Sequence, residues 1–585
     1  MSDDTIPNLP DQKELEKEIG DYLSRKYGSQ VKIISTGLFP SSQPEGEKNT
    51  KVKKDSQVSF HFDLKPEDLV AYLDEYVVEQ DEAKAVLATK ICTHFNRIRH
   101  DQERGGRTST GQIKSNVLLI GPTGVGKTYL IKLIAKRIGI PFVKGDATKF
   151  SETGYVGGDV EDLVRDLVRE ADDSIEKAQC GIIYVDEIDK IAASPHRIGA
   201  DVSRTGVQRA FLKPMEETEI ELKVPHDPIS QIEAMEHYRA TGKREKRVVN
   251  TRNILFIMSG AFSGLEETVS KRIQHRSIGF EQHVSSPKLD YRSLKQVKAQ
   301  DLIEYGFESE FVGRLPVVAV LDELTEDDHF EILMNPNSSV VVAKKQDFAA
   351  YGIKLQFDEE ALHAVARKAV KEGTGARGLV SVMEHTLLHF EKKLPSTDIR
   401  FLVVSKDMVE VPGRALSMLL ENKDIQSEHI SRYEELTKEE FERLKAFITD
   451  KHTYSFTSQD LLLTEKRLSL IASQCQQEIM DPREACHECI VLINHIKQYA
   501  DAASDEYEIL IHFNDAAIDR ILSRHPLNFE AVDSICDKIL SAFEYGLRLI
   551  GQKSDIAELE ITEEGVDNPV EFINERVNVF FKIDD

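Results

Sequence analysis

The chain has 585 residues, long enough for about three or four domains and a large hydrophobic core. Its 40% hydrophobic and 30% charged residues are typical of a soluble globular protein, and no apolar run is long enough to span a bilayer. The net charge of −26 argues against binding nucleic acid through bulk electrostatics, although it allows a local basic patch. Six scattered cysteines and an N-terminus without a leader-like apolar region predict a protein of the reducing cytoplasm.

Residues 1–60 are mostly polar and are predicted to be an N-terminal segment that ends in a flexible linker. A helix is expected to open at 65–74, and a long helix to run on to about Arg99. Short apolar runs then alternate with helical segments up to residue 258. This alternation predicts an α/β fold, with a parallel sheet and helices on both faces. The expected strands are 117–120, 142–143, 181–185 and 253–258, and the expected helices between them are 127–138, 159–172 and 204–217.

The stretch NVLLIGPTGVGKT, from Asn116 to Thr128, predicts the first functional site. Its glycine loop fits the pattern GxxxxGK[ST] and lies between an apolar strand and a helix. In that context backbone N–H groups and the helix dipole hold phosphate. Lys127 would reach the β- and γ-phosphates of a nucleoside triphosphate, and the Thr128 hydroxyl would ligate Mg²⁺. The predicted nucleotide-binding residues here are Gly121, Pro122, Thr123, Gly124, Val125, Gly126, Lys127, Thr128 and Tyr129.

Two acidic residues follow the apolar strand at 181–185. Asp186 suits the Mg²⁺ shell, usually through water, and Glu187 suits orienting and deprotonating the water that attacks the γ-phosphate. Such a pair is common where a strand meets a solvated turn, but in this place after a phosphate loop it predicts hydrolysis. The strand at 253–258 ends at Ser259. That serine either touches the γ-phosphate or the attacking water, or is an ordinary turn residue.

Taken together, these segments resemble the ClpX family of AAA+ protein unfoldases over about residues 64–412. The resemblance implies ATP and Mg²⁺ as cofactors, a large AAA+ ATPase domain at 64–324 and a mainly helical small AAA+ domain at 325–412. It also implies that Val77 and Val78, in YVVEQ, line the adenine pocket. The family usually has glycine where this chain has Glu79, which leaves the local backbone open.

The same resemblance assigns two arginines. Arg314, in EFVGRLP, matches the arginine finger that reaches the nucleotide of a neighbouring subunit and stabilises charge in the transition state. Arg377, in GTGARGL, matches the sensor arginine with which the small domain reports the γ-phosphate. Together with Glu187 and Ser259 they form the predicted catalytic set. An arginine finger supplied by a neighbour implies an oligomer, which in the family is a homo-hexameric ring.

A glycine-flanked aromatic loop matches the family's pore loop, which grips client polypeptides. The aromatic ring gives sequence-tolerant contact area, and the glycines let the loop move. The alternative is an ordinary turn between a strand and a helix. The loop consists of Gly154, Tyr155, Val156 and Gly157.

A second loop matches the family's IGF tripeptide, which docks into apolar pockets on a ClpP-type peptidase ring. An exposed isoleucine and phenylalanine on a polar loop suit such an anchor-in-pocket contact. The alternative is a loop folded back on its own domain. The residues are Ile278, Gly279 and Phe280.

The chain also departs from the family. No cysteine precedes Cys92, so the family's N-terminal zinc domain is not expected. An insert-like stretch between Glu219 and Val248 ends in the basic cluster TGKREKR, where the family has an RKH loop. This cluster is either a pore-entrance contact or a solvated run of charge.

Residues 413–505 are predicted to form a charged helical extension, and residues 506–585 a degenerate second copy of the small domain. YGIKLQFDEEALHAVARKAV, at 351–370, resembles YEILIHFNDAAIDRILSRHP, at 507–526. The second copy lacks the GARGL motif, so no nucleotide role is expected of it. The alternative is an independent unit with the same β-α-α-β order.

Cys486 and Cys489 form a lone CxxC. A zinc site would need a second pair of ligands at the usual spacing, and the neighbouring sequence offers only scattered extras such as Cys475 and His495. Whether these cysteines bind a metal stays open.

Three functions fit these motifs. The first is an ATP-driven unfoldase that threads client proteins through a hexamer pore and delivers them to a ClpP-type peptidase. The second is a stand-alone remodelling chaperone with the same motor, and the third is a nucleotide-sensing scaffold without hydrolysis. The IGF tripeptide separates the first from the second, and Glu187 separates both from the third. No membrane or nucleic-acid partner is expected.

Overall fold

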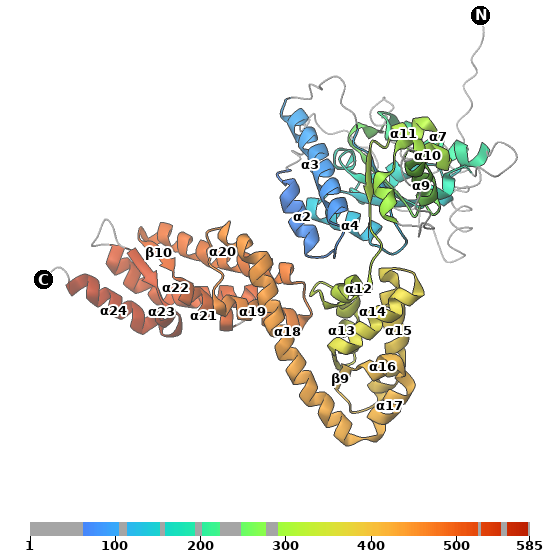
Figure 1. Ribbon diagram of the computed structural model, residues 1–585. Coiled ribbons are helices and arrows are strands. Elements are labelled where there is room, and N and C mark those ends of the chain that lie inside the picture. Colours follow the sequence, from blue (N-terminus) through green and yellow to red (C-terminus); the bar gives the residue numbers. More distant parts are fainter. Residues whose placement is uncertain are drawn as a thin grey trace, which may run out of the picture.

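Figure 1 shows an α/β large domain, a small helical domain beside it, and a C-terminal module that a long helix connects to the small domain. We use "C-terminal module" for residues 465–582. No helix in the described ranges is both long enough and apolar enough to cross a bilayer. The computed structural model describes residues 62–104, 114–151, 158–193, 202–222, 247–276, 291–524, 528–551 and 558–582.

A five-stranded sheet in the order β2-β3-β6-β1-β7 forms the centre of the large domain. All neighbouring strands pair in parallel, which confirms the predicted α/β fold. Parallel strands need crossover helices, and these cover both faces of the sheet. The strands are β1 (Val117–Ile120), β2 (Phe142–Asp146), β3 (Ile182–Asp186), β6 (Leu255–Gly260) and β7 (Val317–Val320).

The side chains of each strand alternate between two hydrophobic cores. In β1, Val117 and Leu119 face one core, while Leu118 and Ile120 face the other. The first core is closed by α2 (Pro66–Asp74), α3 (Asp81–Glu103) and α4 (Lys127–Ile138). The second is closed by α5 (Asp162–Glu170), α6 (Ile175–Ala178), α7 (Val202–Met215), α9 (Leu265–Arg276), α10 (Ala299–Tyr305) and α11 (Ser309–Gly313). A small antiparallel pair, β4 (Glu219–Glu221) with β5 (Val248–Asn250), adds to the second side.

The strand at 117–120 and the helix at 127–138 have the predicted bounds. Strand β2 is longer than the predicted 142–143, because Lys144 and Gly145 pair with Tyr184 and Val185 of β3. The apolar pattern could not reveal this extension, since a lysine and a glycine occupy it. Tertiary pairing decides it instead.

The small domain is helical around one parallel strand pair, β8 (Lys354–Phe357) with β9 (Phe401–Val404). Its hydrophobic core continues past the predicted boundary at 412, because Leu419 is fully buried in it. The helices are α12 (Glu326–Met334), α13 (Ser339–Ala349), α14 (Glu359–Glu372), α15 (Ala376–Lys393), α16 (Lys406–Glu410) and α17 (Pro412–Glu421).

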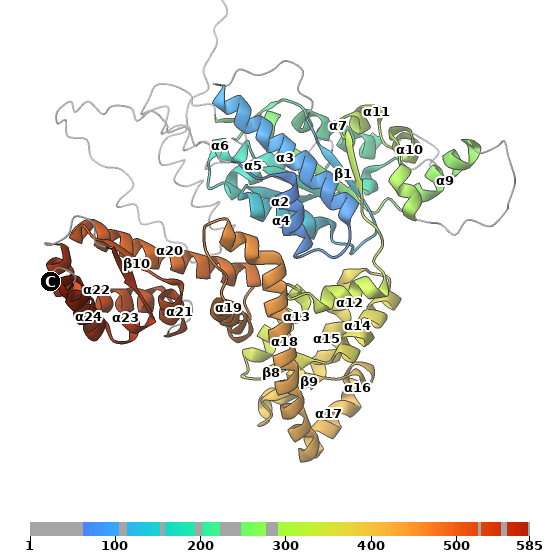
Figure 2. The ribbon, with the colours of Figure 1, turned by 60° about the vertical axis from the view of Figure 1, so that its left-hand side comes forward.

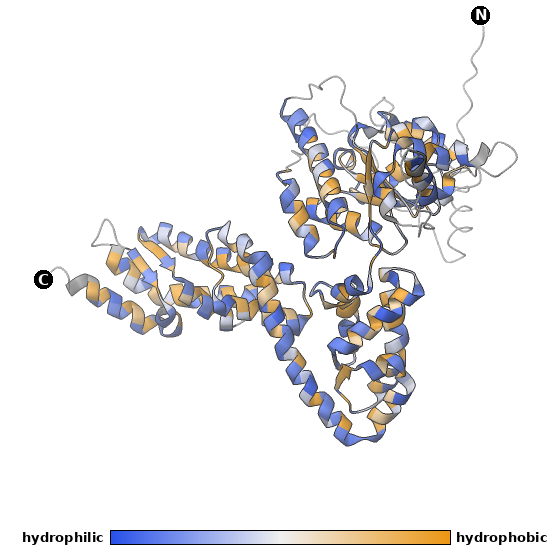
Figure 3. Cartoon of the chain, in the orientation of Figure 1, coloured by the Kyte–Doolittle hydropathy of each residue, from blue (hydrophilic) through white to orange (hydrophobic). Residues whose placement is uncertain are grey.

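Helix α18 (Lys423–Thr457) joins the small domain to the C-terminal module (Figure 2). Its first half lies along β8 and β9, where the backbone N–H of Val403 donates to His429 Nδ1 at 3.0 Å. Its second half packs Ile448 and Phe456 into the core of the C-terminal module. Outside these contacts the surface of α18 is largely hydrophilic (Figure 3), as expected of a solvent-exposed helix that connects two domains.

The C-terminal module repeats the small domain's order of elements. Strands β10 and β11 pair in parallel, from Leu510 with Glu558 to Phe513 with Ile561, and two helices lie between them, as in β8 and β9. A short helix and a proline-initiated helix follow in both cases. This shared order supports the interpretation of a second copy. The elements are α19 (Glu465–Glu478), α20 (Pro482–Tyr507), β10 (Leu510–Phe513), α21 (Asp515–Arg524), α22 (Phe529–Gly551), β11 (Glu558–Ile561), α23 (Glu563–Asp567) and α24 (Pro569–Lys582).

Candidate nucleotide-binding site

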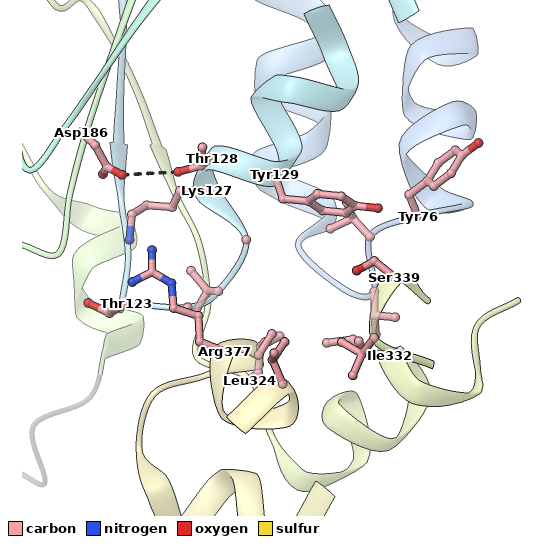
Figure 4. Close-up of a pocket in the computed structure, with 18 of the residues that line it drawn as sticks. Tyr76, Thr123, Lys127, Thr128, Tyr129, Asp186, Leu324, Ile332, Ser339 and Arg377 are labelled. Carbon is pink, nitrogen blue, oxygen red and sulfur yellow. Dashed lines mark hydrogen bonds between the residues drawn. The ribbon is translucent and has the colours of Figure 1, made fainter. Parts of the chain in front are cut away.

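A cavity of about 410 Å³ lies at the carboxyl ends of the central strands, between the large and small domains. Ligands in open parallel sheets bind at this edge. Figure 4 shows Lys127, Thr128, Asp186 and Arg377 grouped on one side of the pocket, with Tyr76 across from them. The walls come from the phosphate loop, the end of β3, the segment before α3, the start of α13 and the start of α15.

The phosphate loop has the backbone that its glycines permit. Gly124 and Gly126 both have positive φ, at 84° and 95°. The Lys127 ammonium donates to the carbonyl oxygens of Gly121 and Pro122, both at 2.7 Å. Burial lowers the pKa of Lys127 to about 8. A phosphate in the pocket would therefore meet a lysine held in place and poorly solvated.

The small domain touches the phosphate loop directly. The backbone N–H of Ala376, at the start of α15, donates to the carbonyl oxygen of Gly124 at 3.0 Å. A Cβ at Gly124 would meet the carbonyl oxygen of Thr374, and a Cβ at Gly375 would meet the backbone of Gly124. Both positions therefore require glycine. The phosphate loop and the start of α15 are thus in direct backbone contact.

Oxygen ligands suited to Mg²⁺ gather beside the loop. Thr128 Oγ1 lies 3.3 Å from Asp186 Oδ2, and Lys144 Nζ lies 3.0 Å from the same carboxylate oxygen. Burial alone would raise the pKa of Asp186, but hydrogen bonds from Ser259 and Lys144 outweigh it and hold that pKa below its usual value. A hydroxyl and an ionised carboxylate side by side fit a hard cation that keeps several waters. Thr128 and Asp186 therefore fit the predicted role.

Glu187 stands at the end of β3 in a strained conformation. Its φ of 57° is left-handed, which is unusual for a residue with a side chain. The side chain is exposed and lines the cavity. The carboxylate therefore lies at the cavity, and its role toward an attacking water stays a prediction from sequence.

Ser259 lies elsewhere than the predicted contact with the γ-phosphate or attacking water. It is fully buried and donates to Asp186 Oδ1 at 2.6 Å, while the Tyr184 hydroxyl lies 2.6 Å from its oxygen. The reason is strand alternation, since Ser259 shares a face of β6 with the buried Leu255 and Ile257. Ser259 therefore positions Asp186 from beneath the site.

Val77 and Val78, which the resemblance assigns to an adenine pocket, line the cavity. Glu79 takes a left-handed backbone with φ of 56°, so the conformation that the family's glycine would favour is kept here with a side chain. Gln80 follows with φ of 66°, and its amide nitrogen donates to the carbonyl oxygen of Asp322 at 2.9 Å. Sequence reasoning missed Tyr76 and Asn335, which also line the cavity. Tyr76 could have been found in the motif YVVEQ, whereas no motif marks Asn335.

The two predicted arginines lie in different places. Arg377 lines the cavity and faces the phosphate loop near Lys127 (Figure 4). Arg314 is half-exposed at the end of α11 and forms an ion pair with Glu216, away from the chain's own cavity. A side chain directed outward is compatible with a contact to a neighbouring subunit.

The two predicted loop motifs fall outside the described residues. These are the pore loop at 154–157 and the IGF tripeptide at 278–280, and most of the basic cluster also falls there. Their roles stay predictions from sequence.

Cys486 and Cys489 lie on α20, buried in the hydrophobic core of the C-terminal module. Burial raises the pKa of Cys489 to about 12, so its thiol stays protonated. Within the described ranges no group of three acidic, histidine or cysteine side chains is placed to hold a metal ion. These two cysteines behave as small core residues.

Comparison with known proteins agrees with the resemblance to ClpX-type AAA+ proteins. Residues 112–318 match the family model for the AAA domain (Cdc48 subfamily), and residues 324–390 match that for the C-terminal, D2-small domain, of ClpB protein. The ATP-dependent Clp protease ATP-binding subunit ClpX 3 of Methylococcus capsulatus is 38% identical over 371 residues, which is 61% of this chain and 83% of that protein. The ClpX subunits of Borrelia duttonii and Borrelia recurrentis are each 40% identical over 347 residues, which is 59% of this chain and 78% of each relative.

Proposed function

The chain belongs to the ClpX family of AAA+ ATPases, and from this premise we propose that it is an ATP-driven unfoldase that threads client polypeptides through a ring. Family membership carries ATP binding and ATPase activity. The observation that best supports the finer proposal is the cavity itself, because Lys127 and Asp186 of the large domain meet Arg377 of the small domain there. Hydrolysis at such a boundary can move one domain against the other.

The residues divide the chemistry of hydrolysis among them. Glu187 would orient the attacking water and accept its proton. Lys127 and the loop N–H groups would stabilise charge on the transferring phosphoryl group. Mg²⁺, held by Thr128 and Asp186, would supply a positive charge that offsets the charge of the β- and γ-phosphates. Ser259 keeps Asp186 ionised and aimed at that position.

Phosphate release would then change the contacts of two arginines, Arg377 of the same chain and Arg314 of a neighbouring chain. Arg377 loses a charge partner, and the hydrogen bond from Ala376 to Gly124 ties this loss to α15 and the small domain. Arg314 would complete the site of a neighbouring chain, which supports a homo-hexamer. Tyr155, between its glycines, would turn the domain movement into a pull on the client.

We further propose that the ring delivers clients to a ClpP-type peptidase through Ile278 and Phe280. The relatives are named as ATP-binding subunits of a Clp protease, which favours this over the stand-alone remodelling chaperone. The expected location is the cytoplasm. All six cysteines are free and buried, which fits a reducing compartment.

The deciding experiment is degradation of an unfolded client by this chain, ATP and a ClpP-type peptidase. Deletion of residues 278–280 should abolish degradation while ATPase activity stays within about twofold, because the deletion removes only the docking anchors. Glu187→Gln should abolish both activities.

The outcomes separate the three functions. Degradation that persists without residues 278–280 would contradict peptidase docking through this loop. Active ATPase with client remodelling but no degradation in the intact chain would favour the stand-alone chaperone. An intact chain without ATP hydrolysis would leave only the nucleotide-sensing scaffold.

A further inference from the structure

Two residues of the C-terminal module bond to the large domain immediately before Val77. Arg483, in the first turn of α20, holds the carboxylate of Glu75 with two hydrogen bonds, one of them from Nε at 2.8 Å. Asp481, the cap of the same helix, accepts a hydrogen bond from the Tyr76 hydroxyl at 2.8 Å. We call Glu75, Tyr76, Asp481 and Arg483 the base-side bracket.

The base-side bracket borders the nucleotide cavity. Tyr76 lines the cavity itself, and Figure 4 places it on the side away from Lys127 and Arg377. The carbonyl oxygen of Glu75 accepts hydrogen bonds from the side chains of Asn335 and Asn337, both at 3.1 Å. These asparagines follow α12 and also line the cavity. Glu75 of the large domain is therefore bonded to two other parts of the chain, the C-terminal module and the segment after α12.

The contact between Arg483 and Glu75 has several supporting partners, and its carboxylate is buried. The Glu75 side chain is only 3% exposed, so its carboxylate depends on a partner. The Arg483 guanidinium also stacks over the Tyr72 ring, 4.9 Å from its centroid. On α18 the buried His452 faces Glu75, with Nε2 3.8 Å from a carboxylate oxygen. A bidentate pair with a buried carboxylate fixes geometry more firmly than an exposed ion pair.

We propose that Asp481 and Arg483 are positioning residues for nucleotide binding, through which the C-terminal module sets the base side of the site. They hold Glu75 and Tyr76, and these hold the wall formed by Val77 and the asparagines after α12. The phosphate side is built from other elements and does not depend on them. The proposal rests on nucleotide binding in this cavity and assigns the C-terminal module a role in it.

The base-side bracket connects the large domain with the C-terminal module and belongs to the hydrophobic core of neither. The C-terminal module has its own hydrophobic core, from Leu444 to Ile573, and the large domain has two others. Loss of the link should therefore change the site without unfolding either part. Loss of the bracket should weaken only the binding of the adenosine half of the nucleotide.

The test compares ADP with inorganic pyrophosphate, which lacks the adenosine half. In Arg483→Gln and Asp481→Asn, the dissociation constant for ADP should rise about tenfold, as for the loss of one charge-assisted hydrogen bond. Pyrophosphate binding, measured by competition, should stay unchanged. The KM for ATP should rise while kcat at saturation is kept, and Arg483→Lys should recover part of the affinity. Arg520→Gln, which breaks an exposed pair with Asp567 in the same module, is the matched control.

Unchanged ADP affinity in both variants would overturn the proposal. An equal loss of ADP and pyrophosphate binding, or a fall in kcat with KM unchanged, would overturn it too, because either points to a general defect. A wild-type chain that binds no ADP would instead reject nucleotide binding in this cavity. The two failures are thus distinguishable.

Discussion

Three residues at or next to the nucleotide cavity have a strained backbone. Glu79, Gln80 and Glu187 all have left-handed φ values between 56° and 66°. Each such residue costs on the order of 1 kcal/mol or more, and the surrounding structure must compensate. Glu79 and Gln80 set the turn that carries Val77 and Val78, while Glu187 is turned out of β3 toward the cavity. Two of the strained residues thus hold the turn next to Val77 and Val78, and the third, Glu187, lines the cavity.

The pKa of Lys127 leads to a pH-dependent affinity. Burial lowers that pKa to about 8 in the free site, and a bound phosphate would raise it again by supplying a counter-charge. Affinity is therefore fully present below pH 8 and falls as the pH rises above it. The dissociation constant for ATP should increase about tenfold between pH 7 and pH 9.

Calorimetric titration of the chain with ATP at several pH values measures this change in the dissociation constant. Lys127→Gln serves as the control, because it should bind weakly at every pH without this slope. A flat profile in the wild-type chain between pH 7 and pH 9 would contradict the expected titration of Lys127.

At the residue scale, the sequence predicts the backbone best where all the residues of a feature lie in one short segment. Gly121 to Thr128 is such a segment, since its conformation follows from its own glycines. The place of Ser259 beneath the site could not be predicted, because the direction of its side chain depends on its position in β6. Lys144 and Asn335 were missed because distant parts of the chain bring them to Asp186 and Glu75.

At the scale of elements, residues 506–582 have the same β-α-α-β order as the small domain, and a second copy of that domain stays a prediction. The sequence predicted its β-α-α-β order from matching apolar positions. It did not indicate that α19 and α20 belong to the same core, because those helices share no motif with α12 and α13. On β10 and β11, His512 and Glu560 occupy the face that α18 covers on β8 and β9, and Glu560 is exposed. The β10–β11 pair therefore carries polar residues on the face that α18 covers in the β8–β9 pair.

Arg467 joins α19 to α21 within the C-terminal module. Its side chain is fully buried, with Nε 2.6 Å from Asp519 Oδ1 and an amino nitrogen 2.7 Å from Asp515 Oδ1. Arg467→Ala would leave the Asp519 carboxylate buried without its charge partner. We expect a loss of about 3–5 kcal/mol in the free energy of unfolding of the module, measured by urea denaturation.

Arg548→Ala supplies the comparison. Its pair with Glu544 is exposed and lies on a single helix, so the loss should be about 0.5 kcal/mol or less. Equal effects of the two substitutions would show that the buried pair contributes nothing specific.

At the scale of the whole molecule, the large and small domains line the nucleotide cavity, and the C-terminal module contacts its edge. The large domain supplies the phosphate loop, and the small domain supplies Arg377. The C-terminal module reaches the base side through Asp481 and Arg483. Helix α18 connects the last two along a path separate from the cavity. All three parts of the chain therefore have contacts at or next to the cavity.

The proposed coupling of this site to protein movement depends on Tyr155. The most direct measurement is the rate at which this chain, with ATP and a ClpP-type peptidase, degrades an unfolded client, alongside the rate of ATP hydrolysis. We predict ATP-dependent degradation by the wild-type chain. In Tyr155→Ala we predict a loss of about tenfold or more, with ATP hydrolysis kept, because the substitution removes the aromatic contact to the client. Degradation that proceeds unchanged in Tyr155→Ala, or equally well without ATP, would contradict a motor that pulls polypeptide through this loop.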